Sequence, residues 1–385
     1  MTSDTMKSNN PSFAIKLKNF LGKLVKNQLF IPIVALLLLV LINLIADPTF
    51  FKIVLEPSST GNLILSGNLI TIIDNASELA ILAIGMTLVT SASGGQDISV
   101  GATIAIAGSV ILRVIKVQPT DISNGRFAAM LILAFVLCVV VSAIFGAFNG
   151  ALVAYFNIQP MVATLILFTA GRSIAAWINN NDNISIKDTR FAYYGNFIPG
   201  IAVPTPVFIT AICLIVIALV LKFTNLRLYS QAVGINASSS RLNGINPKMI
   251  KLLTFIILGV CVAVCGFIKV SRTSSITYSV IANNIEMDAI LAVALGGNAL
   301  SGGKFNITSS VIGAYVIQFL TTTLYKFKVS SSAISAYKAV VVILLIIISA
   351  PIVRRWFEDM KNKREAARVA KIATAANTES GKENV

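Results

Sequence analysis

The chain contains no histidine and few charged residues, and acidic side chains are especially scarce. Of 385 residues, 16 are Asp or Glu and 31 are Lys or Arg, so only 12% are charged. Without histidine the chain cannot form a Ser-His triad, an imidazole metal site or a histidine proton relay. The 4 cysteines all lie in apolar runs, which indicates packing and no disulfide framework or metal site.

A phosphate-binding loop is also missing. Residues 297–304 resemble one, but a Walker A loop ending at Lys304 needs glycine at position 298 and Ser or Thr at 305. Those positions hold Asn298 and Phe305. We therefore expect no ATP hydrolysis and no cofactor in this chain, which is predicted not to be an enzyme.

Long hydrophobic runs dominate what is present. Hydrophobic residues make up 56% of the chain, and the mean hydropathy is +0.82. Residues 127–171 contain no Asp, Glu, Lys or Arg. One membrane span needs about 20 residues, so this run should cross twice and turn near residues 157–160.

The sequence predicts an all-α, polytopic membrane protein of about ten transmembrane helices, with broken or re-entrant segments near 91–98 and 296–304. The expected spans are 29–46, 62–90 (long enough to be broken), 98–115, 127–155, 160–179, 204–222, 249–268, 286–297, 305–325 and 333–353. They form one transmembrane domain over 29–353, between a basic tail at 1–28 and a second tail at 354–385.

The basic residues suggest an orientation. With both termini in the cytoplasm, inner Lys and Arg residues outnumber outer ones about twofold. The formal net charge of +15 could suggest nucleic acid. In a membrane protein, basic segments beside anionic lipid are the ordinary explanation, and we expect lipid contact and no nucleic-acid partner.

The most informative motif is the stretch Gly94–Gly101, where a glycine pair and Asp97 interrupt two apolar segments. Non-helical backbone at membrane depth is tolerated only inside protein or along a wet cavity, so this stretch predicts a solute path. Residues 289–303 show a similar order of apolar half-span, glycine pair and Ser-Gly entry into a helix. An internal repeat around a binding path and chance similarity both explain that likeness.

Seven polar residues are candidates for the translocation path. Asp97 could instead cap the helix that opens at Ser99, and uncharged polar residues could simply join helices. Arg172 lies inside a predicted span and needs a partner or a wet lumen, with Asp97, Glu78 and Glu286 as possible partners. The candidates are Asp97, Ser99, Asn149, Gln159, Thr164, Arg172 and Asn298.

Together these motifs resemble the inner-membrane permease subunits of ribose- and galactofuranose-type ABC sugar importers. The resemblance covers residues 62–350 and rests on 94–101, on 149–172, on 296–305 with Gly313-Ala314, and on 338–341. The Ile158-Gln159-Pro160 and 288–291 segments favour the galactofuranose-type branch.

The resemblance implies partners as well as a fold. It implies a second permease subunit, identical or different, a cytoplasmic ATPase and an external solute-binding protein. It also implies that residues 232–246, otherwise a basic loop, form the segment that couples to the ATPase. The coupling candidates are Gly234, Asn236, Ala237, Ser239, Ser240, Arg241 and Gly244. Gly234 and Gly244 are expected to set the turns of this segment, because glycine tolerates a positive φ.

The predicted function is therefore uptake of a monosaccharide across the cytoplasmic membrane by an ABC importer. The same machinery importing a nucleoside or another small polar solute is the first alternative. An ion-coupled secondary carrier is the second, although the absence of histidine and the few acids within spans argue against it.

Overall fold

The structure, a computed structural model, describes residues 29–57, 63–116 and 123–349. Two compact units divide the chain, the first ending at Ile334 and the second beginning at Ser335. The two predicted tails, 1–28 and 354–385, lie outside the described residues.

Helices account for most of the described chain. The long helices are α2 (Phe30–Ala46), α3 (Asn68–Ser93), α4 (Val100–Lys116), α5 (Asn124–Ala154), α6 (Pro160–Ile178), α8 (Thr205–Phe223), α11 (Pro247–Thr273), α13 (Ile307–Lys326) and α14 (Ser331–Ser349). Shorter helices are η1 (Pro48–Phe51), α7 (Thr189–Ala192), α9 (Leu226–Ile235), α10 (Ala237–Leu242) and α12 (Ile285–Leu295). Two antiparallel strand pairs complete the set: β1 (Val54–Pro57) with β2 (Leu63–Ser66), and β3 (Ile184–Ser185) with β4 (Ser275–Ile276).

The helices confirm the predicted fold class, a polytopic all-α membrane protein. Among the described residues, 6 helices are long and apolar enough to cross a membrane: α3, α5, α6, α8, α11 and α13. The apolar parts of α2 and α14 are shorter. With 11 residues, α12 is about 16 Å long, which is less than a bilayer core.

One helix, α3, occupies the centre of the first unit. Every residue from Ala76 to Ala92 is buried, although Ser77, Glu78 and Thr87 are polar. A helix buried all round is typical of the middle of a bundle, and α3 packs against α8, α9, α11, α12 and α13. The prediction of a break within the span 62–90 is wrong. Residues 63–66 form β2, and α3 runs uninterrupted from Asn68 to Ser93.

Glycines bring α5 and α11 into close contact. A methyl group at Gly146 would lie 2.5 Å from the carbonyl oxygen of Phe255 on α11. A methyl group at Gly259 would collide with the carbonyl of Ser142 on α5. Small residues allow this approach, which is the usual way in which helices associate inside a membrane.

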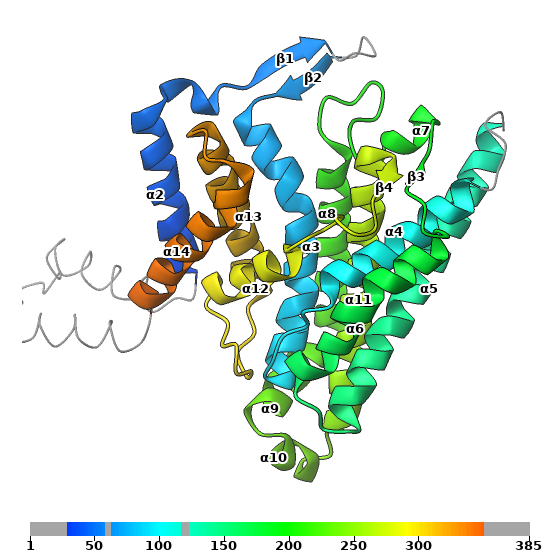
Figure 1. Cartoon of the computed structure of the whole chain (residues 1–385). Helices are drawn as coiled ribbons and strands as arrows, with labels where there is room; N and C mark the ends of the chain where they lie inside the picture. The colour runs from blue at the N-terminus through cyan, green and yellow to red at the C-terminus, as the bar shows by residue number, and fades with distance from the viewer. Residues whose placement is uncertain (1–28, 58–62, 117–122, 350–385) are drawn as a thin grey trace, which may run out of the picture. The chain divides into compact units, whose positions relative to one another are not determined.

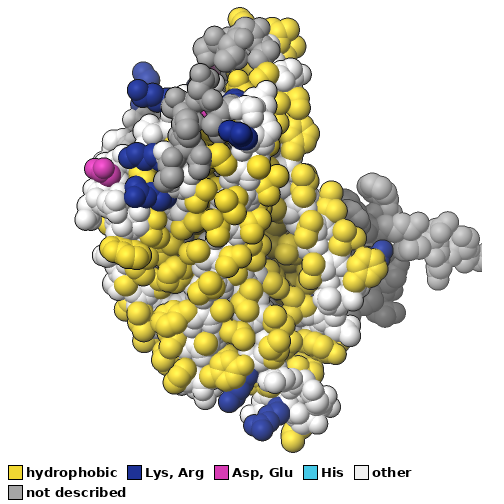
Figure 2. All heavy atoms as spheres, turned by 90° about the vertical axis from the view of Figure 1, so that its right-hand side faces the viewer, with side chains coloured by type: hydrophobic (Ala, Val, Ile, Leu, Met, Phe, Trp, Pro, Cys, Tyr) yellow, Lys and Arg dark blue, Asp and Glu magenta, His cyan; other side chains and the backbone are white. Residues whose placement is uncertain are grey.

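The outer helices turn apolar side chains away from the bundle. On α5, Ile132 is 64% exposed and Ile144 is 59% exposed, and on α8 Ile212 and Ile215 are each 60% exposed. Figure 2 shows hydrophobic side chains across the middle of one face, with Lys and Arg gathered toward its two ends. This distribution is typical of a surface covered by lipid.

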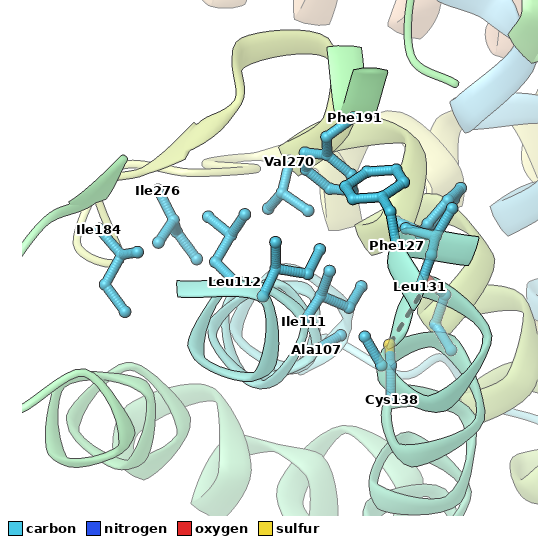
Figure 3. Close-up of a cluster of buried hydrophobic side chains, with 14 residues drawn as sticks. Ala107, Ile111, Leu112, Phe127, Leu131, Cys138, Ile184, Phe191, Val270 and Ile276 are labelled. Carbon is cyan, nitrogen blue, oxygen red and sulfur yellow. Dashed lines mark hydrogen bonds between the residues drawn. The ribbon is translucent and has the colours of Figure 1, made fainter. Parts of the chain in front are cut away.

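The two ends of the first unit differ. One end carries β1, β2, β3, β4 and α7, and the opposite end carries α9 and α10 (Figure 1). At the first end, a cluster of buried side chains from α4, α5, α7, α11 and the β3–β4 pair closes the bundle (Figure 3). Phe191 of α7 and Phe267 of α11 meet there with ring centroids 6.0 Å apart, so the short elements are anchored to the helices.

Candidate functional site

The connection between α3 and α4 holds the first group of candidate residues. It begins at Gly94, whose φ of +67° ends α3 in a left-handed conformation that suits glycine. Asp97 then turns back on the chain: its Oδ1 accepts the Ser99 backbone N–H at 2.7 Å and the Ser99 hydroxyl at 2.6 Å. The carboxylate thus fixes the turn that leads into α4, where the carbonyl of Ser99 accepts the first helical hydrogen bond, from Thr103.

Two other helices complete this group, which we call the Asp97 cluster (Asp97, Ser99, Asn149 and Thr164). Asn149 of α5 donates from Nδ2 to Ser99 Oγ at 2.9 Å and to Asp97 Oδ2 at 3.3 Å. Thr164 of α6 accepts the backbone N–H of Ile98 at 3.2 Å. All four side chains are at most 4% exposed, so residues from three segments form one buried polar site.

The second glycine-interrupted segment, between α12 and α13, is closed by Asn298. Its Oδ1 accepts the backbone N–H of Asn306 at 2.8 Å, and its Nδ2 donates to Ser310 Oγ at 2.7 Å. Ser310 also accepts the hydroxyl of Thr87 on α3 at 2.7 Å. Asn298 therefore links its own loop to the central helix.

The two interrupted segments lie against each other. Gln96 donates from Nε2 to the carbonyl oxygen of Leu300 at 3.0 Å. A methyl group at Gly94 would lie 2.8 Å from the carbonyl oxygen of Ser301. The glycines at these turns allow backbone to meet backbone, and the sequence likeness between the segments thus corresponds to a shared location.

Helix α9 contacts both interrupted segments, the α3–α4 connection and the α12–α13 connection, through Gly234. A methyl group at Gly234 would collide with the carbonyl oxygen of Ser91, at the end of α3, and would lie 2.6 Å from the backbone nitrogen of Gly303. That same Gly303 N–H donates to Ser91 at 3.0 Å. Three segments distant in sequence thus meet at one point.

Arg172 lies apart from the Asp97 cluster, on α6. Its guanidinium donates to the backbone carbonyls of Tyr278 at 3.0 Å and Ile281 at 3.1 Å. In the described part of the chain, no carboxylate lies within ion-pair distance of it. Of the proposed acidic partners, Glu286 packs its carboxylate against Gly101, and it lies near enough for the charge of Arg172 to act on it without forming an ion pair.

Glu78, the third acid considered, belongs to a charged network between α3 and α11. Its carboxylate accepts from Lys269 Nζ at 2.6 Å and lies 3.2 Å from Arg272 Nε. Arg272 also pairs with Asp74 at 2.7 Å. Sequence reasoning missed this network, because the predicted span 249–268 ends just before Lys269 and Arg272. An acid within an apolar span was the available signal, since such a group needs a buried partner.

The predicted coupling segment consists of two short helices and a turn. Asn236 caps α10, since its Oδ1 accepts the Ser239 N–H at 2.9 Å. Gly244 has φ of +80° and ends the following turn, whereas Gly234 lies inside α9 with helical backbone. The expectation that positive φ explains both glycines therefore holds for Gly244 and is wrong for Gly234, whose reason is close approach to Ser91.

Comparison with known protein families assigns the chain to one of them. A family model described as "Branched-chain amino acid transport system / permease component" matches residues 68–350. The chain belongs to this permease family. It is accordingly a transport subunit and not itself an enzyme, and the family predicted from the motifs is confirmed.

Curated members of the permease family cover nearly the whole chain. This chain is 34% identical to the fructose import permease protein FruF of Bifidobacterium longum, over 93% of this chain and 97% of the relative. It is 36% identical to the galactofuranose transporter permease protein YtfT of Escherichia coli (83% and 88%) and 33% identical to its ribose import permease protein RbsC (82% and 92%). No solved structure matches.

The permease thus brings together some of the seven path candidates and separates others. Asp97, Ser99, Asn149 and Thr164 form one site, and Asn298 lies in the adjoining segment that Gln96 reaches. Gln159 is exposed at the start of α6, and Arg172 is half-buried on that helix.

Proposed function

We propose that this permease forms part of the membrane pathway of an ABC importer for a monosaccharide. The observation that carries the proposal is identity of 33–36% to permeases named for fructose, galactofuranose and ribose, over at least 82% of the chain. The path is proposed to run beside the Asp97 cluster and Asn298. Their amide and hydroxyl groups offer the donors and acceptors that suit a hydroxyl-rich solute.

The identities to the three sugar permeases are nearly equal, so they do not select a sugar. The family description itself favours a second candidate, a branched-chain amino acid. A nucleoside or another small polar solute is a third. An uptake assay in cells with and without the gene, using labelled fructose, ribose, galactose, uridine and leucine in parallel, separates these possibilities. Loss of leucine uptake with normal uptake of all three sugars would overturn the proposal.

The proposed partners are a cytoplasmic ATPase, an external solute-binding protein and a second permease subunit. Both termini are proposed to be cytoplasmic, which places α9 and α10 on the ATPase side. In vesicles containing this permease without an ATPase, a proton or sodium gradient should drive no accumulation. Accumulation under those conditions would indicate an ion-coupled carrier instead.

Residues 232–246 are proposed to dock on the ATPase. Gly244 and Arg241 are both exposed, and a side chain at Gly244 would meet no atom within 4 Å. Substitution there disturbs the local turn and charge without disturbing the bundle. The test is the double variant Gly244→Val with Arg241→Glu, which should reach the membrane at normal levels but lose both transport and ATPase co-purification.

The chain offers a matched control at the opposite end. Gly200 also has positive φ, +87°, with no atom within 4 Å of an added methyl group, and Arg126 is likewise exposed. Gly200→Val with Arg126→Glu carries the same backbone strain and charge reversal but should retain the ATPase. If Gly244→Val with Arg241→Glu also retains the ATPase and transports normally, the segment is merely a basic loop.

A further inference from the structure

A second site lies between α10 and the ends of α5 and α11. A cavity of about 670 Å³ opens there. Its lining includes Ala154 at the end of α5, Asn157 just after it, Arg241 of α10, and Lys248 and Lys251 in the first turns of α11. It is separate from the Asp97 cluster, with which it shares no residue.

The cavity is strongly basic. Three of the residues that line it are Lys or Arg, and no Asp or Glu is among the described lining residues. None of these three cations forms an ion pair within the described part of the chain; Lys248 instead lies over the ring of Tyr155, with Nζ 5.6 Å from the centroid. Converging cations without an internal counter-charge favour an anion from outside the chain.

The charge comes from side chains rather than from the start of α11. The first free amides of that helix are already occupied, because Asn246 Oδ1 accepts the backbone N–H groups of Lys248 at 3.1 Å and Met249 at 3.3 Å. The ligand must therefore be recognised by the ammonium and guanidinium groups, which are well suited to phosphate oxygens.

The position of the cavity favours a lipid over a soluble anion. It lies at the ends of two helices that are long and apolar enough to cross a membrane, since α5 ends at Ala154 and α11 begins at Pro247. Between the lining residues Ala154 and Asn157 in sequence, Tyr155 is 51% exposed and Phe156 is 71% exposed. Exposed aromatic rings and lysines together are typical of a membrane interface, and basic pockets there accommodate acidic head groups.

We propose that this basic cavity binds the phosphate head group of an anionic phospholipid. The head group would enter between α10 and α11, with Arg241, Lys248 and Lys251 around its phosphate, while the acyl chains lie along the exposed apolar side of α5. The cavity shares Arg241 and Gly244 with the segment proposed to dock on the ATPase. The site still goes beyond the proposed function, since binding of the head group requires neither a sugar nor an ATPase. It would couple the position of α10 to the composition of the surrounding membrane.

The test measures binding to the full-length permease in neutral detergent. Dihexanoyl phosphatidylglycerol, dihexanoyl phosphatidylcholine and inorganic phosphate are titrated separately, and the midpoint of thermal unfolding is followed. Phosphatidylglycerol should raise the midpoint saturably, and phosphatidylcholine should not. An equal response to inorganic phosphate at the same concentration would show a free-anion site and overturn the lipid proposal.

Variants assign the response to the cavity. Lys248→Gln with Lys251→Gln should weaken phosphatidylglycerol binding about 25-fold, since each cation contributes about fivefold near an anionic surface. Arg241→Gln, on an exposed helix, is a second variant and should lose about fivefold. The control, Lys222→Gln with Lys304→Gln, removes two exposed lysines that do not line the cavity and should bind as the unaltered permease does.

Two outcomes contradict the proposal. Unchanged phosphatidylglycerol binding in both cavity variants would show that the response arises elsewhere. In the variant Lys248→Gln with Lys251→Gln, which leaves residues 232–246 unaltered, retained lipid binding combined with loss of ATPase co-purification would show that the cavity receives an acidic segment of the partner protein. Because neither readout depends on transport, failure here leaves the proposed sugar import untouched, and failure of sugar uptake leaves this site untouched.

Discussion

Replacing Gly234 by alanine puts one methyl group at the point where α9 meets the ends of both interrupted segments. That methyl would collide with the carbonyl oxygen of Ser91 and lie 2.6 Å from the nitrogen of Gly303. Both obstacles are backbone atoms, so no side-chain rotation relieves the clash. Either the Ser91–Gly303 hydrogen bond, 3.0 Å long, breaks or α9 moves outward.

Two opposing effects set the size of the change. Alanine favours a helix over glycine by about 1 kcal/mol, whereas forcing a methyl group into packed backbone costs about 1–3 kcal/mol. We expect Gly234→Ala to be destabilised by about 1 kcal/mol and to lose most transport, because α9 no longer seats against the two segments. Gly125→Ala is the matched control: this helical glycine of α5 has no atom within 4 Å of an added methyl group.

The assay is thermal unfolding in detergent together with solute uptake in cells. Gly125→Ala should unfold at the same temperature as the unaltered permease or slightly above, with normal uptake. A Gly234→Ala variant that is as stable as Gly125→Ala and transports normally would refute the reasoning, because it would mean that α9 is not held against Ser91 and Gly303.

Three further predictions concern charged groups. Glu78→Gln should destabilise the permease by several kcal/mol, because it leaves Lys269 without the buried carboxylate 2.6 Å away; thermal unfolding measures this. Asp47, just after α2, has its pKa lowered to about 2, first by its hydrogen bond to Lys326 and then by Thr49. Its stabilising effect is therefore full above its ordinary pKa of 3.8 and is lost as pH falls toward 2, so Asp47→Asn should remove that part of an unfolding-versus-pH curve. Asp97→Asn should keep transport, since an amide oxygen can still accept the Ser99 N–H, whereas Asp97→Ala leaves that buried N–H without its acceptor and loses about 1–3 kcal/mol of stability.

Each of these has a clear contrary result. Glu56→Gln makes the same chemical change on an exposed residue of β1 and should be neutral, so equal effects of Glu56→Gln and Glu78→Gln would contradict the buried-pair reasoning. An Asp47→Asn variant whose acid unfolding curve overlies that of the unaltered chain would contradict the lowered pKa. Complete loss of uptake in a stable Asp97→Asn variant would assign the carboxylate charge to the transport path itself.

The helices could be predicted well where a single pattern determines them. The uncharged run 127–171 is too long for one span, and Pro160 can begin a helix but cannot continue one, so the turn between α5 and α6 was predictable to within a few residues. The β1–β2 pair was not, because the apolar residues Leu63–Leu65 are equally compatible with the start of a span. Only pairing with residues 54–57 makes them a strand.

The contacts between distant segments were the least predictable. Glu78 and Lys269 are separated by 191 residues, and no periodicity links them. Gly234 was expected to form a turn because glycine permits a positive φ. In the structure it is helical, and the absence of a side chain is what lets α9 approach Ser91 and Gly303. Asp97 and Ser99 could be paired from sequence because a cap acts over two residues, whereas the arrival of Asn149 from α5 depends on tertiary packing.

The glycine-lined contact between α5 and α11 also restricts how the permease can move. With backbone touching backbone at Gly146 and Gly259, neither helix can slide or rotate against the other without immediate collision. We therefore expect these two helices to move as one rigid unit during transport. Any opening and closing of the path has to take place where contacts consist of longer, rearrangeable side chains, so distance probes placed on α5 and α11 should keep a constant separation while the rest of the bundle changes around them.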